Sequence, residues 1–240
     1  MIPLRDDVAS RSVPVVTIGL IVLNVLVYLY ELSLGAGSGA SAGSGAAEAF
    51  VVEFGARPCQ LSGSCMALDD FPGPVVTLFT SMFMHSLNPV HVTGNMLYLW
   101  IFGDNVEDTL GHGRFLIVYL LAGVGAALMQ TLSAPRSVVP MIGASGAVSG
   151  VLGAYLLLFP YATILTLVVF GFFIRTVHIP AVIVLGFWIV LQLVNGWLTM
   201  SASAMGRGET GGVAWFAHIG GFLAGMVLLL LFRPRTSRRP

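Results

Sequence analysis

The 240-residue chain has no lysine and few charged residues of any kind. Charged side chains make up 9% of the sequence and hydrophobic residues 56%, whereas a soluble globular domain carries about 25% charged residues. These proportions exclude an ordinary soluble domain and predict a polytopic, mostly helical membrane protein. Because all 11 basic residues are arginines, a Ser–Lys dyad and Schiff-base chemistry are excluded as well. The formal net charge is zero, so no nucleic-acid partner is implied.

Cysteine is also scarce. The two cysteines, Cys59 and Cys65, lie in one polar loop. They can form a disulfide if that loop faces an oxidising compartment, and two free thiols are the alternative.

Apolar runs of about 20 residues mark transmembrane helices. Six spans are predicted, at about residues 13–34, 90–102, 115–132, 144–159, 180–200 and 213–232. The second is short as delimited here, so we expect it to begin within residues 81–88. The Gly/Ala/Ser stretch at 35–47 predicts a flexible linker in a long outer loop, 35–86. Residues 161–179 are apolar but contain Arg175 and His178. We interpret them as an interfacial connector, and a seventh span is the alternative.

The distribution of arginines predicts the orientation in the membrane. With six spans both termini lie on one side, and that side receives eight of the 11 arginines. The positive-inside rule therefore places a short N-terminal segment (1–12) and an Arg-rich tail (233–240) in the cytoplasm, flanking a membrane domain at 13–232. The Gly/Ala-rich composition is associated with a bacterial cytoplasmic membrane.

A serine and a histidine each stand at the start of an apolar run. Ser145 opens the fourth span and His218 opens the sixth. Serine is a weak nucleophile until a base takes its proton. A serine and a histidine are therefore the smallest set of side chains that could carry out covalent hydrolysis within a bilayer. Small-residue stripes containing Gly146 and Gly221 would let the two helices pack closely. By itself Gly-Ala-Ser-Gly is a weak motif, and glycines that serve packing alone are the alternative.

His91 and Asn95 strengthen the hydrolytic interpretation. They are four residues apart, so both project from one helix face, and both can donate hydrogen bonds. Together with the Ser145 backbone N–H they could stabilise the oxyanion of a tetrahedral intermediate, while a polar clamp between helices is the alternative. No Asp or Glu lies inside the third to sixth spans, so the site would be a Ser–His dyad. A His-Glu-x-x-His zinc motif and paired intramembrane aspartates are missing, and no metal or cofactor is implied.

Four motifs together resemble those of the prokaryotic-type rhomboid family of intramembrane serine proteases. Residues 143–146 (Gly-Ala-Ser-Gly) are similar to the family's G-x-S-G, and residues 217–221 to its A-H-x-x-G. His91 with Asn95 resembles H-x-x-x-N, and residues 103–111, which contain Glu107, resemble G-x-x-x-E-x-x-x-G. The resemblance covers residues 77–232.

The resemblance implies an all-α, six-helix membrane bundle around a water-accessible cavity. It implies Ser145 as nucleophile, His218 as general base and then acid, and an oxyanion hole formed by His91, Asn95 and the Ser145 amide. Gly143, Gly146 and Gly221 would shape the site. Glu107 would be structural at the cytoplasmic end, with a solvated helix-end charge as the alternative.

The family's substrates are transmembrane segments of membrane proteins, and the fifth helix with residues 201–212 would gate their lateral access. Some members stack an aromatic residue, four positions after the nucleophile, on the histidine. Serine occupies that position here, Ser149, so another group must orient His218. The alternative functions are an inactive relative that binds transmembrane helices and, less favoured, a transporter.

Overall fold

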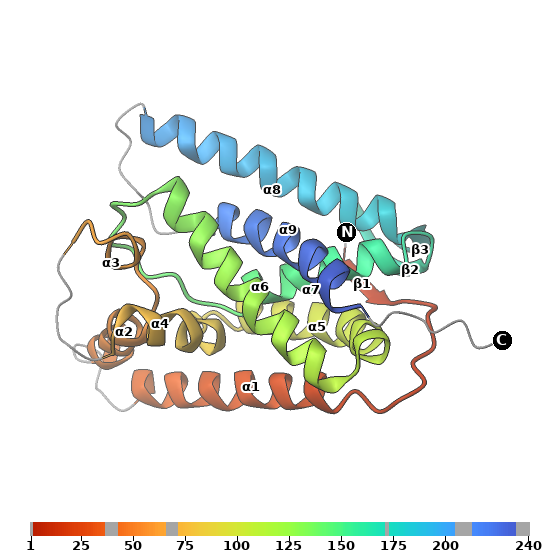
Figure 1. Ribbon diagram of the computed structural model, residues 1–240, viewed down its shortest axis with the longest axis horizontal. Coiled ribbons are helices and arrows are strands. Elements are labelled where there is room, and N and C mark those ends of the chain that lie inside the picture. Colours follow the sequence, from red (N-terminus) through yellow and green to blue (C-terminus); the bar gives the residue numbers. More distant parts are fainter. Residues whose placement is uncertain (1, 37–42, 66–71, 171–172, 205–212, 234–240) are drawn as a thin grey trace.

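A computed structural model describes residues 2–36, 43–65, 72–170, 173–204 and 213–233. In chain order its elements are β1 (Ile2–Arg5), α1 (Val15–Ala36), α2 (Gly43–Phe54), α3 (Pro58–Leu61), α4 (Pro74–Thr80), the 3-10 turn η1 (Ser81–Phe83), α5 (Pro89–Leu110), α6 (His112–Ser133), α7 (Ser145–Leu158), β2 (Thr163–Phe170), β3 (Phe173–Pro180), α8 (Ala181–Ala204) and α9 (Trp215–Phe232). The helices α1 and α8 lie on opposite sides of the bundle, with α5, α6, α7 and α9 between them (Figure 1).

Four of the described helices, α1, α6, α8 and α9, are long and apolar enough to cross a membrane. Their outward surfaces carry large apolar side chains, such as Phe187 and Trp197 on α8, which are 48% and 67% exposed. Such surfaces are favourable against lipid and unfavourable against water. The chain is therefore a membrane protein. The second and fourth predicted spans correspond to α5, which is more polar, and α7, which has 14 residues. The count of six spans stays a prediction.

Two predicted boundaries are wrong. The second helix begins at Pro89 rather than within residues 81–88, and it extends to Leu110. The Asn88 side chain accepts a hydrogen bond from the Val90 N–H (3.0 Å), and Pro89 occupies the first helical position; both features start a helix sharply. The linker predicted at 35–47 is helical in part, because α2 begins at Gly43. Residues 37–42 of that linker, and 234–240 of the predicted tail, lie outside the described residues.

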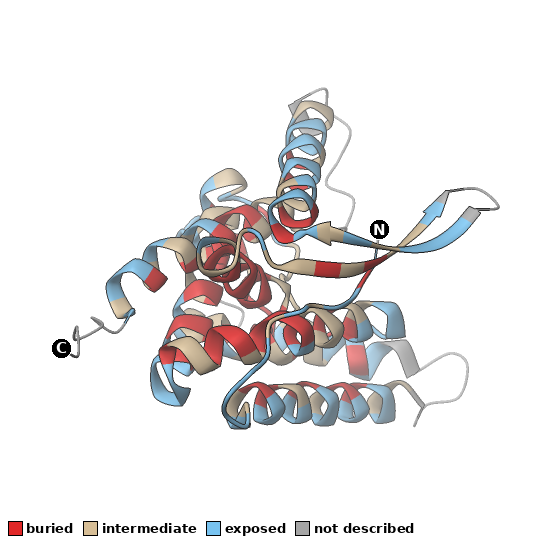
Figure 2. Cartoon of the chain, turned by 90° about the vertical axis from the view of Figure 1, so that its right-hand side faces the viewer, coloured by how far each residue is buried: buried red, intermediate tan, exposed pale blue. Residues whose placement is uncertain are grey.

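The prediction of an all-α fold is wrong in one respect. The structure also contains three strands, which form an antiparallel sheet in the order β1-β2-β3. Residues 161–179, interpreted as a connector, contain the β2–β3 hairpin, in which Thr166 pairs with Val177. Its β-branched residues favour strands, and Ile164 is buried against the helices. Ile2 of β1 pairs with Leu167, so the N-terminal residues lie beside the α7–α8 connection. Figure 2 shows the hairpin extending away from the helices.

Helix α7 lies at the centre of the bundle, and every residue from Gly146 to Tyr155 is buried. Its backbone contacts that of α9 directly. A Cβ atom added at Gly221 would collide with the carbonyl oxygen of Gly146, and one added at Gly225 with that of Gly150. This is the close approach that the small-residue stripes predict, and it fixes the spacing of the two helices that carry Ser145 and His218.

Candidate active site

Ser145 is the first residue of α7, and the turn before it requires a glycine. Gly143 has φ +125°, and a Cβ atom there would lie 2.9 Å from the His91 Nε2 atom, so the position combines left-handed backbone with a close approach. Because Ser145 begins the helix, its backbone N–H has no partner within α7. That N–H is a donor beside the Ser145 hydroxyl.

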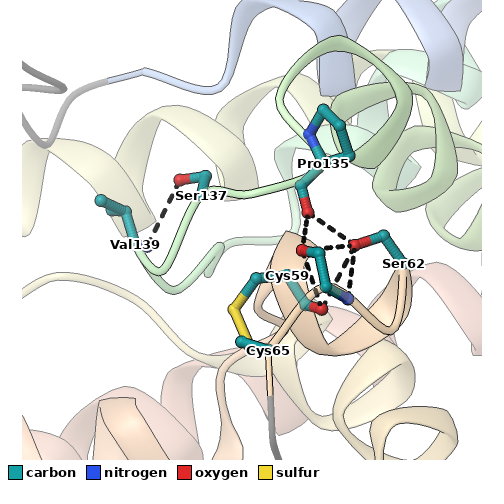
Figure 3. The surroundings of a disulfide bond; sticks show 7 residues. Cys59, Ser62, Cys65, Pro135, Ser137 and Val139 are labelled. Atoms are coloured by element: carbon teal, nitrogen blue, oxygen red, sulfur yellow. Dashed lines mark hydrogen bonds between the residues drawn. A yellow bond between two sulfur atoms is a disulfide. The ribbon is translucent and has the colours of Figure 1, made fainter.

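The loop that enters α7 is fixed by the polar loop that contains the cysteines. Cys59 and Cys65 form a disulfide, with Cα atoms 5.2 Å apart. The Cys59 N–H donates to the Ser137 carbonyl (2.9 Å), and the Ser62 and Ser64 hydroxyls donate to the Pro135 carbonyl (2.5 and 2.6 Å). Figure 3 shows the contact of Ser62 with Pro135 beside the disulfide. The cystine loop therefore anchors the segment that leads to the serine.

The Ser145 hydroxyl and the His218 ring are in hydrogen-bond contact. Ser145 Oγ lies 2.9 Å from His218 Nε2. His218 lies in the first turn of α9, whose start is formed in part by the bond from the His218 N–H to the Ala214 carbonyl (3.3 Å). The two side chains come from residues 73 positions apart, and the α7–α9 backbone contact brings them together.

Three side chains surround the His218 ring, and the sequence analysis identified none of them. Gln192 Oε1 lies 2.8 Å from His218 Nδ1. The Trp188 ring lies over the imidazole at 5.8 Å between centroids, and Trp215 presents an edge at 6.3 Å. The Ser149 hydroxyl instead donates to the Ser145 carbonyl (2.6 Å). The signal available in the sequence was Gln192 itself, an amide within a mostly apolar span.

His91 and Asn95 line the same cavity as Ser145 and His218, which has a volume of about 1200 Å³. The Ser86 N–H donates to His91 Nδ1 (3.4 Å), and the Ser86 hydroxyl lies 3.2 Å from the same atom. A backbone N–H can only donate, so Nδ1 is the acceptor and Nε2 carries the ring proton. The His91 Nε2–H is therefore a second donor near Ser145.

Asn95 is held by His85, whose ring nitrogen Nε2 lies 3.1 Å from Asn95 Nδ2. Burial, followed by the neighbouring His91, lowers the pKa of His85 to about 4, so this ring is neutral and can accept the amide hydrogen. The His85 backbone N–H donates to the Glu31 carboxylate (3.0 Å). This chain of contacts orients the Asn95 amide, which keeps one N–H for the cavity.

Glu107 lies outside this cluster and is buried rather than solvated, with 1% of its surface exposed. Its carboxylate accepts hydrogen bonds from the backbone N–H groups of Val16 (2.9 Å) and Thr17 (2.7 Å) and from the Thr17 hydroxyl (2.7 Å). His112 Nδ1 contacts the same carboxylate at 2.6 Å. Glu107 thus joins the end of α5 to the start of α1.

Residues 72–235 match the family model of the Rhomboid domain. The chain belongs to the rhomboid family. It is 31% identical to RHOMBOID-like protein 6, mitochondrial, of Arabidopsis thaliana, over 67% of this chain and 45% of the relative. It is 30% identical to Rhomboid protein 1, mitochondrial, of Saccharomyces cerevisiae, over 66% of this chain and 42% of the relative. Rhomboid protease GluP of Bacillus subtilis is 40% identical over 33% of this chain and 15% of the relative.

The chain thus spans half or less of the length of these curated relatives. Their names describe two mitochondrial proteins and a protease. In this chain the serine, the histidine and the two oxyanion candidates line one cavity. Within the described ranges, no group of three or more His, Cys, Asp or Glu side chains forms a metal-binding cluster. The contact between the Ser145 hydroxyl and the His218 ring suits nucleophilic chemistry at Ser145.

Proposed function

We propose that this rhomboid-family chain is an intramembrane serine endopeptidase in which Ser145 is the nucleophile and His218 the base. The observation that carries the proposal is the 2.9 Å contact between Ser145 Oγ and His218 Nε2. A nucleophile and a base within hydrogen-bond reach, with the base oriented by a third group, are the signature of an activated serine. An inactive relative would not need this geometry.

In the first half of the reaction, His218 Nε2 takes the Ser145 proton as Oγ attacks the carbonyl carbon of the scissile peptide bond. The negative charge moves to the carbonyl oxygen, where the Ser145 N–H, the His91 Nε2–H and the Asn95 amide stabilise it. The intermediate collapses, the C–N bond breaks, and the protonated His218 gives its proton to the leaving amine.

In the second half, water attacks the acyl-enzyme while His218 takes one of its protons. The Ser145–acyl bond breaks, the serine recovers its proton from His218, and the new carboxyl terminus leaves. The cavity has room for this water beside the substrate, since it has a volume of about 1200 Å³ and both polar and apolar walls.

The substrates we propose are transmembrane segments of other membrane proteins. The cavity is lined by residues of both α5 and α8, such as Val90 and Trp188. Lateral access from the bilayer between these helices would bring an apolar segment to Ser145. Residues 205–212, part of the predicted gate, lie outside the described residues.

The topology we propose has six membrane-spanning helices and both termini in the cytoplasm. The arginine distribution supports this orientation, and it places the cystine loop and the first turns of α5, α7 and α9 toward the outer side. A bacterial inner membrane is the location we propose, although the two eukaryotic relatives named above are mitochondrial.

The decisive experiment compares cleavage of a tagged single-pass membrane substrate by wild type, Ser145→Ala and His218→Ala in the same membranes. Ser149→Ala is the matched control, because this serine lies one turn further along α7 and its hydroxyl donates to a backbone carbonyl of the same helix. Product from wild type and Ser149→Ala, with none from the other two variants, supports the proposal. Equal product from Ser145→Ala refutes it.

A serine-directed fluorophosphonate probe makes the test independent of the substrate chosen. Labelling of wild type that Ser145→Ala abolishes supports a reactive serine at this position. If wild type is neither labelled nor active, the chain is instead an inactive relative.

A further inference from the structure

Gln192 is a buried amide in the middle of α8, a mostly apolar helix, and 6% of its surface is exposed. Its two polar atoms have different partners. Nε2 lies 3.2 Å from the Trp188 carbonyl oxygen, one turn earlier in the same helix, and Oε1 lies 2.8 Å from His218 Nδ1.

These contacts determine which nitrogen of His218 carries the proton. The Trp188 carbonyl can only accept, so the Gln192 NH₂ group must face it and the amide oxygen must face the histidine. Because that oxygen is also only an acceptor, His218 Nδ1 must be the N–H. In a neutral imidazole the other nitrogen, Nε2, is then unprotonated, and Nε2 is the atom that faces the Ser145 hydroxyl (2.9 Å).

We propose that Gln192 is a positioning residue that fixes the reactive tautomer of His218, so that the site works as a Ser145–His218–Gln192 triad. This inference rests on the proposed protease function and assigns the role that an acidic residue has in other serine hydrolases. A neutral amide suits this place, because a carboxylate in an apolar helix would carry a desolvation cost that an amide avoids.

The location of Gln192 adds a consequence for access of the substrate. Trp188 and Gln192 are four residues apart and project from one face of α8 toward His218 on α9. The helix that borders the proposed lateral access path therefore also carries the groups that orient the base. The triad is complete only while α8 packs against α9, so displacement of α8 from α9 would remove the group that orients His218.

The test uses two substitutions at Gln192. Gln192→Leu removes the acceptor for His218 Nδ1, and Gln192→Glu keeps an acceptor and adds a charge. Asn195→Leu is the matched control, since Asn195 is an amide on the same helix whose Nδ2 donates to the Leu191 carbonyl (2.8 Å), within α8. The measurements are kcat and KM for a membrane substrate across pH 5–9, fluorophosphonate labelling, and the unfolding temperature in detergent.

We expect Gln192→Leu to lower kcat at least tenfold with little change in KM, and Asn195→Leu to behave as wild type. In Gln192→Glu a carboxylate beside Nδ1 would stabilise the protonated imidazole, which is the inactive form of the base. The acid limb of its pH–rate profile should therefore move to higher pH by about one unit or more, with activity recovered toward pH 9.

A Gln192→Leu variant that keeps wild-type kcat would overturn the proposal. If Gln192→Leu does not fold, the Glu variant decides: an acid limb at the wild-type pH would mean that Gln192 serves only packing. In either case a wild type labelled at Ser145 leaves the protease function standing. A wild type without cleavage or labelling would instead overturn that function, and this inference with it.

Discussion

Replacing Glu107 by alanine should destabilise the protein strongly, although Glu107 lies outside the candidate active site. The substitution would leave two backbone N–H groups, those of Val16 and Thr17, and the Thr17 hydroxyl without their acceptor. Thr17 is fully buried and Glu107 is 1% exposed, so these donors cannot all turn to solvent. It would also remove a carboxylate from the N-terminal turn of α1, where negative charge is favourable.

The magnitude follows from the number of donors. A buried donor without a partner costs about 1–3 kcal/mol. Water that enters the space left by the Glu107 side chain would accept hydrogen bonds from some of the three donors. We therefore expect a loss of about 3 kcal/mol in the free energy of unfolding. For a protein of this size each kcal/mol lowers the unfolding temperature by roughly 2–4 °C, which gives a decrease of about 6–12 °C.

The assay is thermal unfolding in detergent, with Asp108→Ala as the matched control. Asp108 is the next acidic residue on α5, and its carboxylate accepts a bond from the exposed Ser12 hydroxyl (2.5 Å). Surface contacts of this kind change stability by about 0.5 kcal/mol or less, so the control should unfold within about 2 °C of wild type. The reasoning fails if Glu107→Ala unfolds at the temperature of the control.

Two further predictions concern the N-terminal segment and the cystine loop. Burial raises the pKa of Asp6 to about 6, despite the bond from the Tyr155 hydroxyl, so ionisation of Asp6 opposes folding as the pH rises through about 6. Asp6→Asn should therefore raise the unfolding temperature by a few degrees at pH 8 and have little effect at pH 4.5; equal effects at both values would contradict this. Cys59 and Cys65 are the only cysteines in the sequence. In intact cells, a maleimide–polyethylene glycol reagent should modify them only after the disulfide has been reduced. Modification without reductant would contradict an oxidised outer loop.

The sequence alone was sufficient to predict most helices, because their signals are local. Apolar runs located α1, α6, α7, α8 and α9 to within a few residues. The start of α5 is also encoded, by Asn88 and Pro89, but these are capping signals that an apolar run does not contain. The hairpin at 163–180 was missed because a short apolar run of β-branched residues has no periodicity that separates strand from helix.

The site was predictable to the extent that its residues belong to short motifs. Four residues in three motifs indicated a serine, a histidine and two donors, and the structure brings all four to one cavity. The contacts of Gln192 and His85 could not be predicted, because they depend on how separate segments pack. Gln192 and His218 are 26 positions apart and lie on different helices. A polar residue in an apolar span indicates that a partner exists, and only the packing identifies the partner.

The distance between Ser145 and His218 and the orientation of the His218 ring depend on different helix contacts, and these contacts differ in rigidity. The distance between Ser145 and His218 depends on the contact of α7 with α9, where glycine backbones touch and no side chain can adjust. The orientation of His218 depends instead on Gln192 and Trp188 of α8, an outer helix with large apolar side chains exposed along its length. Movement of α8 would therefore leave the serine and histidine adjacent while removing the group that sets the proton position on the ring. Under the proposed mechanism, the nucleophile and the base would therefore stay assembled, and the packing of α8 would set whether His218 can act as the base.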